Sequence, residues 1–90
     1  MKLTEAEVEA VMESRFYNEW ELKWINVEGK CISLSWYILL MCIDDLEQYV
    51  YKGKKSHIEW RVKPIKDYFN LSGTAKQLLE KLNELKKMYE

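Results

Sequence analysis

The chain contains little proline, glycine or cysteine, the residues typical of flexible linkers and of disulfide-rich proteins. Its 90 residues include one proline, three glycines and two cysteines. So little proline and glycine leaves almost no room for linkers or disordered tracts, and the length suits one domain over residues 1–90. Two cysteines outside any Cys-x-x-Cys motif do not make a disulfide framework, so we expect Cys31 and Cys42 to be free thiols in a reducing compartment.

Long apolar runs are also missing. The longest runs from Trp36 to Ile43 and has eight residues, whereas a helix that crosses a bilayer needs about 20. The N-terminal segment is acidic with a helical pattern, which differs from the basic and then apolar stretch of a signal peptide. We therefore expect a cytoplasmic protein without a membrane partner.

The residues that usually carry catalysis are scarce and lie in no recognisable motif. Gly29, Gly53 and Gly73 stand alone, so the chain has no glycine-rich phosphate loop. His57 is the single histidine, and its distance in sequence from either cysteine matches no zinc-site spacing and does not show a nucleophile paired with a base. We expect no enzyme activity, no metal and no cofactor.

Two capping boxes predict where the first and last helices begin. Thr4 with Glu7, and Thr74 with Gln77, have the required spacing. The first helix is expected to end near Tyr17. The C-terminal helix carries an apolar stripe spaced 4-3-4-3-4, which comprises Leu71, Ala75, Leu78, Leu82, Leu85 and Tyr89. This stripe suits packing within the chain or against a second copy, so a homodimer through the C-terminal helix is also considered.

Alternating apolar and polar residues predict a β-hairpin around a turn at Glu28 and Gly29. The apolar members of this pattern are Trp20, Leu22 and Trp24 before the turn, and Ile32, Leu34 and Trp36 after it. The following segment, residues 36–52, is predicted to be a helix, because its apolar residues share one helical face and Gly53 provides a C-terminal stop. A strand over residues 48–51 is the alternative.

A third strand is predicted where Ile58, Trp60 and Val62 alternate with polar residues, ending at Pro64. A short helix beginning after Ser56 is the alternative. Pro64 would then open a short helix reaching residue 70. The sequence thus predicts a small α+β domain in the order helix–β-hairpin–helix–strand–helix, with a three-stranded antiparallel sheet packed by helices.

Charge is spread unevenly along the chain. Residues 1–21 hold two cations and six glutamates, a net of −4, and residues 52–66 hold six cations and one glutamate, a net of +5. Aromatic residues interleave with the cations over residues 49–68, a combination that suits phosphate neutralisation and base stacking. The partner-binding residues predicted from these patterns are Glu5, Glu9, Glu13, Tyr51, Lys52, Lys54, Lys55, His57, Arg61, Lys63, Lys66 and Lys76.

The C-terminal segments also have the outline of a helix-turn-helix, whose second helix reads bases with its N-terminal residues. Those residues would be Thr74, Lys76, Gln77 and Lys81. Glu80 and Glu84 would face phosphates from the same surface, so we favour packing as the role of this helix.

The uneven charge and the many aromatic residues favour a protein that binds a large partner. The leading hypothesis is a small protein-binding module that acts by stoichiometric binding to a macromolecular partner. Twelve lysines against two arginines are typical of an AT-rich genome, which suggests a phage or bacterial inhibitor or regulator. The alternative is a nucleic-acid-binding protein that uses residues 49–68 together with the C-terminal helix.

Overall fold

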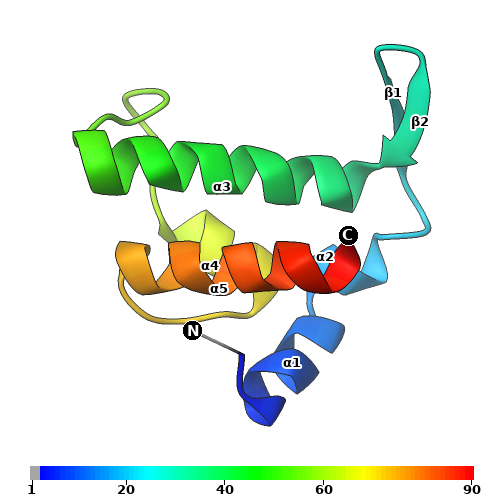
Figure 1. Cartoon of the computed structure of the whole chain (residues 1–90), viewed down its shortest axis with the longest axis horizontal. Helices are drawn as coiled ribbons and strands as arrows, with labels where there is room; N and C mark the ends of the chain where they lie inside the picture. The colour runs from blue at the N-terminus through cyan, green and yellow to red at the C-terminus, as the bar shows by residue number, and fades with distance from the viewer. Residues whose placement is uncertain (1–2) are drawn as a thin grey trace.

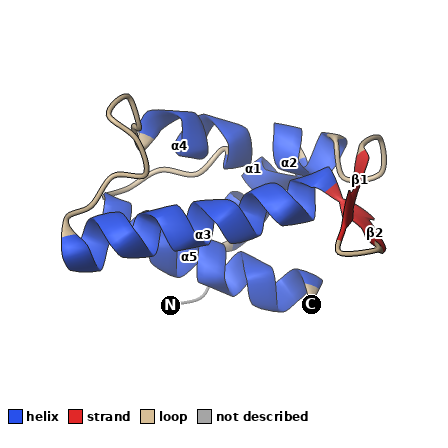
Figure 2. Cartoon of the chain, turned by 90° about the horizontal axis from the view of Figure 1, so that it is seen from above, coloured by secondary structure: helices blue, strands red, loops and turns tan. Residues whose placement is uncertain are grey.

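Helices make up most of the computed structural model, which describes residues 3–90. Within that range there are five: α1 (Glu5–Met12), α2 (Arg15–Asn18), α3 (Leu34–Lys52), α4 (Lys63–Phe69) and α5 (Ala75–Tyr89). α3 and α5 lie side by side and run in opposite directions (Figure 1), and α3 lies between α4 and α5 when the molecule is seen from above (Figure 2). Two strands, β1 (Trp24–Val27) and β2 (Lys30–Ser33), form an antiparallel ribbon that projects from the N-terminal end of α3.

The helix starts that the sequence predicts are confirmed in atomic detail. The Thr4 hydroxyl accepts a hydrogen bond from the backbone N–H of Glu7, whose carboxylate accepts one from the N–H of Thr4, at 3.1 and 3.0 Å. Thr74 and Gln77 repeat this exchange at the start of α5, at 3.2 and 2.9 Å. Gly53 follows α3 in the left-handed conformation, with φ of 65°, as expected for a glycine that ends a helix.

The first helix is shorter than predicted because Ser14 divides it. The Ser14 side chain is buried, donates to the carbonyl of Val11 and accepts a hydrogen bond from the N–H of Tyr17. A serine at this point can satisfy both the end of one helix and the start of the next. The chain therefore turns between α1 and α2, and this turn directs Phe16 into the core, where it is fully buried.

The core is built mainly on α3, α4 and α5, and the buried residues of α4 are Ile65, Tyr68 and Phe69. α3 contributes a buried row of Leu39, Ile43 and Leu46, and the buried residues of α5 are Leu78, Leu79, Leu82 and Leu85. The leucines of the 4-3 stripe are thus used inside the molecule, as favoured above. A dimer through α5 would have to use other residues of this helix.

Aromatic contacts explain why the first strand begins later than predicted. The Trp20 ring lies 5.1 Å from that of Tyr89, 5.4 Å from Phe16 and 6.1 Å from Trp36, measured between centroids. These contacts hold Trp20 against the body, so residues 19–22 form turns and β1 begins at Trp24. Leu34 and Trp36, predicted in the second strand, belong to the first turn of α3.

The predicted third strand is wrong. Residues 53–62 form an irregular loop, and the short helix considered after Ser56 is not formed either. Ile58 is 90% exposed, whereas Trp60 is 6% exposed and its ring packs 5.0 Å from that of Tyr49. The hairpin lies at the other end of α3 (Figures 1 and 2), so within residues 3–90 no strand edge is near enough to pair with this segment.

The remaining helices follow the prediction. Residues 36–52 are helical rather than a strand, and α4 has Pro64 in its first turn. Within residues 3–90, none of the helices combines the length and the apolar character needed to span a bilayer.

Candidate interaction surfaces

The hairpin is closed by a tight two-residue turn. Glu28 and Gly29 both have positive φ, 51° and 83°, as the favoured hairpin turn requires. The Asn26 side chain accepts a hydrogen bond from the N–H of Gly29 at 3.0 Å. The predicted turn is therefore confirmed, and it fixes a register in which Ile25 faces Ile32 and Val27 faces Lys30.

Neither strand of this ribbon pairs with a further strand within the described residues. The N–H of Leu34 donates to the carbonyl of Lys23 at 2.9 Å, so hydrogen-bonded pairs alternate along the ribbon from that point. It follows that the backbone groups of Trp24 and Asn26 in β1, and of Cys31 in β2, point away from the neighbouring strand. The sheet has two strands within residues 3–90, so a third strand could pair on either side.

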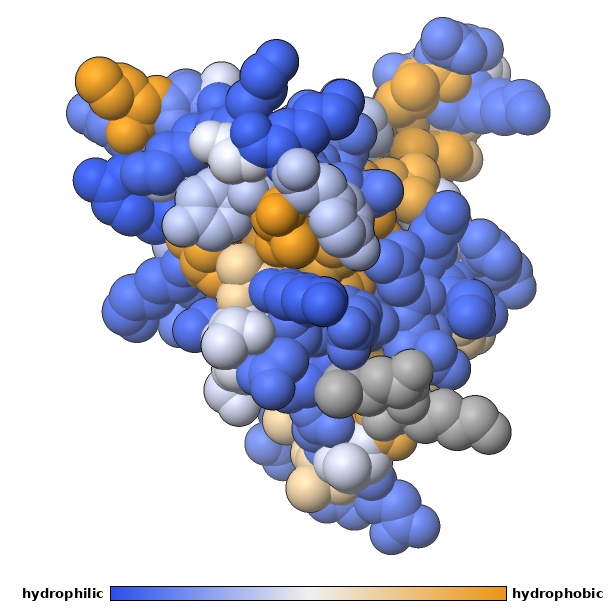
Figure 3. Space-filling model, turned by 60° about the vertical axis from the view of Figure 1, so that its left-hand side comes forward, coloured by the Kyte–Doolittle hydropathy of each residue, from blue (hydrophilic) through white to orange (hydrophobic). Residues whose placement is uncertain are grey.

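The ribbon also carries large apolar side chains outside the core. Leu22, just before β1, is 76% exposed, and Trp24 is 53% exposed. The Trp24 indole N–H donates to the carbonyl of Glu21 at 3.1 Å, which holds the ring in one orientation. Figure 3 shows apolar atoms on the projecting ribbon at its upper right. Scattered exposed apolar residues are ordinary, but two neighbours on a projecting element are typical of a contact surface.

The sequence pattern identified Trp24 and Leu22 only as apolar members of the hairpin, and neither was among the predicted partner-binding residues. A signal was present: Trp24 points to one face of the ribbon, and Ile25 and Val27 point to the other. Helices that cover one face of a sheet cannot bury both sets. Ile25, Val27 and Ile32 are only partly buried and lie outside the core cluster.

The predicted basic residues are divided among α3, the 53–62 loop, α4 and α5. Lys52 ends α3, and Lys54, Lys55, His57 and Arg61 are exposed on the 53–62 loop. The predicted third strand would have placed His57, Arg61 and Lys63 on one face. That strand is not formed, and Arg61 donates to the carbonyls of Ile58 and Trp60 within the loop.

The other predicted cations lie on the helices that follow the loop. Lys63 begins α4 and forms an ion pair with Asp67 at 3.1 Å. Lys66 is half-buried on the same helix, and Lys76 is exposed on α5.

Most of the interleaved aromatic residues serve the fold. Trp60 and Tyr68 are buried, and Tyr49 is half-buried against Trp60. Tyr51 is 68% exposed. Of these four side chains, Tyr51 is therefore the one with a ring face available for stacking on a base.

The helix-turn-helix arrangement has little of the chemistry needed to read bases. The side chains of Thr74 and Gln77 are engaged in their capping box. Lys81 pairs with Glu7 at 2.7 Å and donates to the carbonyl of Ser72 at 2.7 Å. Of the four predicted base contacts, Lys76 alone points to solvent without such a role in the described chain.

The acidic face of α1 is confirmed as an exposed surface. Glu5, Glu9 and Glu13 are all exposed. Glu5 and Glu9 border a shallow cavity of about 280 Å³ whose apolar lining comes from Leu3 and Val8. The sequence therefore identified the charged residues of this surface but not the apolar cavity between them.

Contacts on its other side hold α1 to the body. The hydrogen bond from Lys81 holds the pKa of Glu7 below its usual value, with further lowering from the Thr4 N–H. The Asn70 amide also donates to the carbonyl of Ala10 at 3.0 Å. These contacts leave Glu5 and Glu9 of α1, and Glu13 at its C-cap, exposed.

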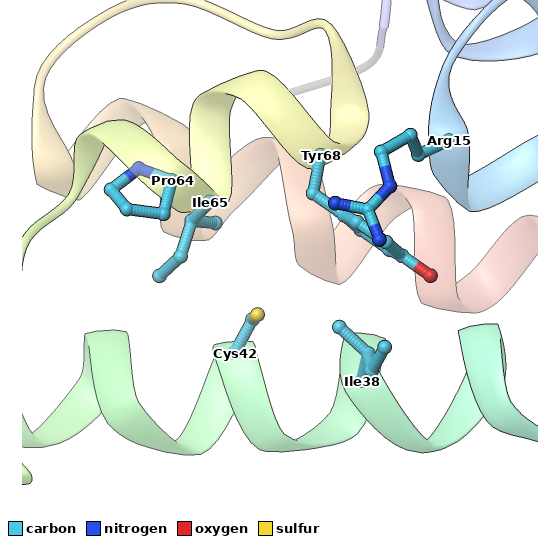
Figure 4. Close-up of a pocket in the computed structure, with 6 residues that line it drawn as sticks. All are labelled: Arg15, Ile38, Cys42, Pro64, Ile65 and Tyr68. Carbon is cyan, nitrogen blue, oxygen red and sulfur yellow. The ribbon is translucent and has the colours of Figure 1, made fainter.

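A second cavity, of about 310 Å³, lies between α3 and α4 (Figure 4). Ile38 and Cys42 line it from α3, and Arg15 lies across the Tyr68 ring, 5.2 Å from its centroid. Burial, with a smaller effect of Asp45, raises the pKa of the Cys42 thiol to about 12. The thiol is therefore protonated at neutral pH and is a poor nucleophile.

Cys31 and His57, which were considered as a possible cysteine–histidine pair, lie far apart. Cys31 lies on the hairpin and His57 on the 53–62 loop, at opposite ends of α3. Within residues 3–90, no three His, Cys, Asp or Glu side chains are grouped so that they could hold a metal ion.

Comparison with known proteins gave no match to a family model, to a curated protein or to a solved structure.

Proposed function

We propose that this chain is a protein-binding module that docks onto one partner through its hairpin. The observation that carries the proposal is the exposure of Trp24, and of Leu22 just before β1, at a projecting ribbon whose apolar residues lie outside the core. A few large side chains usually supply most of the energy of an interface, and tryptophan is prominent among them. Because a hydrogen bond already orients the Trp24 ring, binding would cost little additional side-chain entropy.

The open edges favour a partner that contributes an extended strand. Such a strand would pair with the outward backbone groups of Trp24 and Asn26, and its alternate side chains would contact the Trp24 ring. A two-stranded ribbon alone is marginally stable in water, so a third strand would complete it. The proposed consequence is stoichiometric regulation or inhibition, in which the chain covers a surface that its partner otherwise uses.

The test compares capture of a partner by the wild-type chain and by two variants of matched chemistry. Trp24→Ser removes the proposed anchor, and Ile58→Ser removes an exposed apolar residue at the far end of α3. Circular dichroism and urea unfolding establish that both variants fold. We expect a partner that binds saturably to the wild type and to Ile58→Ser but not to Trp24→Ser. Capture that Trp24→Ser leaves unchanged, or absence of any saturable partner, would contradict the proposal.

Nucleic-acid binding is the second candidate. It is supported by Lys54, Lys55 and Arg61, which are exposed on one loop and form no ion pair with the described residues. Three phosphate contacts predict a log–log salt slope of about −2 to −3. Anisotropy titrations of labelled duplex DNA, single-stranded DNA and RNA test this slope, and replacing the three cations with Glu should abolish binding. No binding at low salt would exclude this candidate.

A further inference from the structure

We propose that the 53–62 loop of one molecule docks into the acidic cavity on α1 of a second copy. The inference starts from Ile58, which is 90% exposed and is the most exposed of the large apolar side chains. Lys54 and Lys55 precede it on the same loop, are exposed, and form no ion pair within residues 3–90. Figure 3, which brings this end of the molecule forward, shows apolar atoms standing out at the upper left among hydrophilic ones. The loop thus presents an apolar tip among positive charges.

The cavity on α1 has the opposite character. Leu3 and Val8 supply apolar lining, and Glu5 and Glu9 supply negative charge at its border. Its volume of about 280 Å³ lies just below the roughly 300–1,000 Å³ typical of small-molecule pockets. An aliphatic side chain inserted from another protein is therefore a better match for it than a drug-sized ligand.

The two surfaces complement each other in charge as well as in apolar character. The segment that holds the loop has a net charge of +5, and the segment that holds the cavity has a net charge of −4. Loop meeting loop, or cavity meeting cavity, would bring like charges together, so the arrangement selects contact between the two unlike surfaces. Charged pairs at the rim would set orientation and salt dependence, while burial of Ile58 would supply most of the attraction.

The contact cannot form within one molecule. The loop lies beyond the C-terminal end of α3, and α1 lies below α5, towards the opposite end of the molecule (Figures 1 and 2). A second copy must therefore supply the cavity. Because loop and cavity are different surfaces, two copies could exchange the contact reciprocally in a closed dimer, and a single unreciprocated contact would instead extend head to tail. The contact also leaves the hairpin of each copy free, so self-association and partner binding through Trp24 are separate events.

Light scattering and sedimentation equilibrium on the full chain test this directly. We expect the weight-average mass to rise above the monomer's 10.9 kDa with concentration at low salt, and to return towards it at high salt because rim charges are screened. Ile58→Ser should remain monomeric across the same range, and Trp24→Ser should associate like the wild type. A wild type that stays monomeric at low salt and high concentration would overturn the proposal.

Charge reversal provides the sharper test. Lys54→Glu/Lys55→Glu should lose self-association, and so should Glu5→Lys/Glu9→Lys. The variant carrying all four changes should regain it, and so should an equimolar mixture of the two double variants. A folded four-fold variant and a mixture that both stay monomeric would refute the contact, as would a loop double variant that associates like the wild type.

Discussion

The ion pair between Glu7 and Lys81 offers a quantitative test of how α1 is attached to the body. One Glu7 carboxylate oxygen accepts from the N–H of Thr4, and the other meets the Lys81 ammonium at 2.7 Å. Glu7→Gln should keep the capping box, since Gln77 serves the same role in α5. The Gln side chain would, however, place an amide N–H₂ or an uncharged oxygen against the Lys81 ammonium in place of a carboxylate oxygen. Hydrogen bonds to charged groups contribute about 1.5–3 kcal/mol, and partial exposure favours the lower end.

We therefore expect Glu7→Gln to lower the free energy of unfolding by about 1.5 kcal/mol near neutral pH. The pH dependence follows from the lowered pKa of Glu7, for which the Lys81 hydrogen bond is the main cause. A carboxyl group with a lowered folded-state pKa stabilises the protein above its unfolded value, here about 4.5, and this stabilisation is lost as pH falls through the folded value. The difference between wild type and Glu7→Gln should accordingly shrink below about pH 4.5.

Urea unfolding followed by tryptophan fluorescence measures this difference. With a slope of about 1.5 kcal/mol per molar urea, the midpoint should fall by about 1 M near neutral pH. Glu9→Gln is the matched control, because Glu9 is exposed on the same helix and forms no ion pair in the described chain; it should change stability by less than about 0.5 kcal/mol. Equal effects of the two variants, or a Glu7→Gln effect that persists undiminished in acid, would refute the reasoning.

Two further predictions concern burial. Cys31 is exposed, whereas burial, and to a smaller extent Asp45, raises the pKa of Cys42 to about 12. Peptide mass spectrometry after iodoacetamide treatment should therefore show one fast-reacting thiol in the native protein and two in denaturant. Equal alkylation rates of Cys31 and Cys42 in the native protein would contradict this placement. Leu82→Ala should cost about 2–5 kcal/mol because Leu82 is fully buried, while Leu22→Ala should cost less than about 0.5 kcal/mol; urea midpoints check both, and similar costs would refute the assigned burial.

Local signals were the part of the fold that the sequence could predict. The hydrogen bonds of a capping box, the left-handed glycine after α3 and the turn at Glu28 and Gly29 involve residues only a few positions apart, so their chemistry is visible in the sequence. The helical face of residues 36–52 extends over several turns, which made its period clear enough to distinguish a helix from a strand. Leu82 and Leu85 likewise belong to a stripe long enough to indicate core packing.

The errors arose where contacts distant in sequence decide the structure. Ile58, Trp60 and Val62 alternate, but a strand needs a neighbouring strand, and the described part of the chain provides none at that end of α3. Trp20 continues the alternation of β1 in sequence, yet contact with Tyr89 holds it in a turn. For the candidate surfaces, the helical pattern predicted that Glu5, Glu9 and Glu13 share one charged face, whereas Trp24 was identified only as an apolar member of a strand, because sequence pattern alone does not show which apolar face remains uncovered.

The hairpin's separation from the core has a consequence for how this protein could evolve. Because Leu22, Trp24 and Ile25 do not belong to the core cluster, substitutions there should alter recognition while leaving the stability of the helices nearly constant. Proteins tolerate new mutations only while their stability stays above a threshold. Mutations in the ribbon should rarely bring the protein below that threshold. It is a place where binding specificity could diversify, by selection or from a designed library, on an unchanged scaffold.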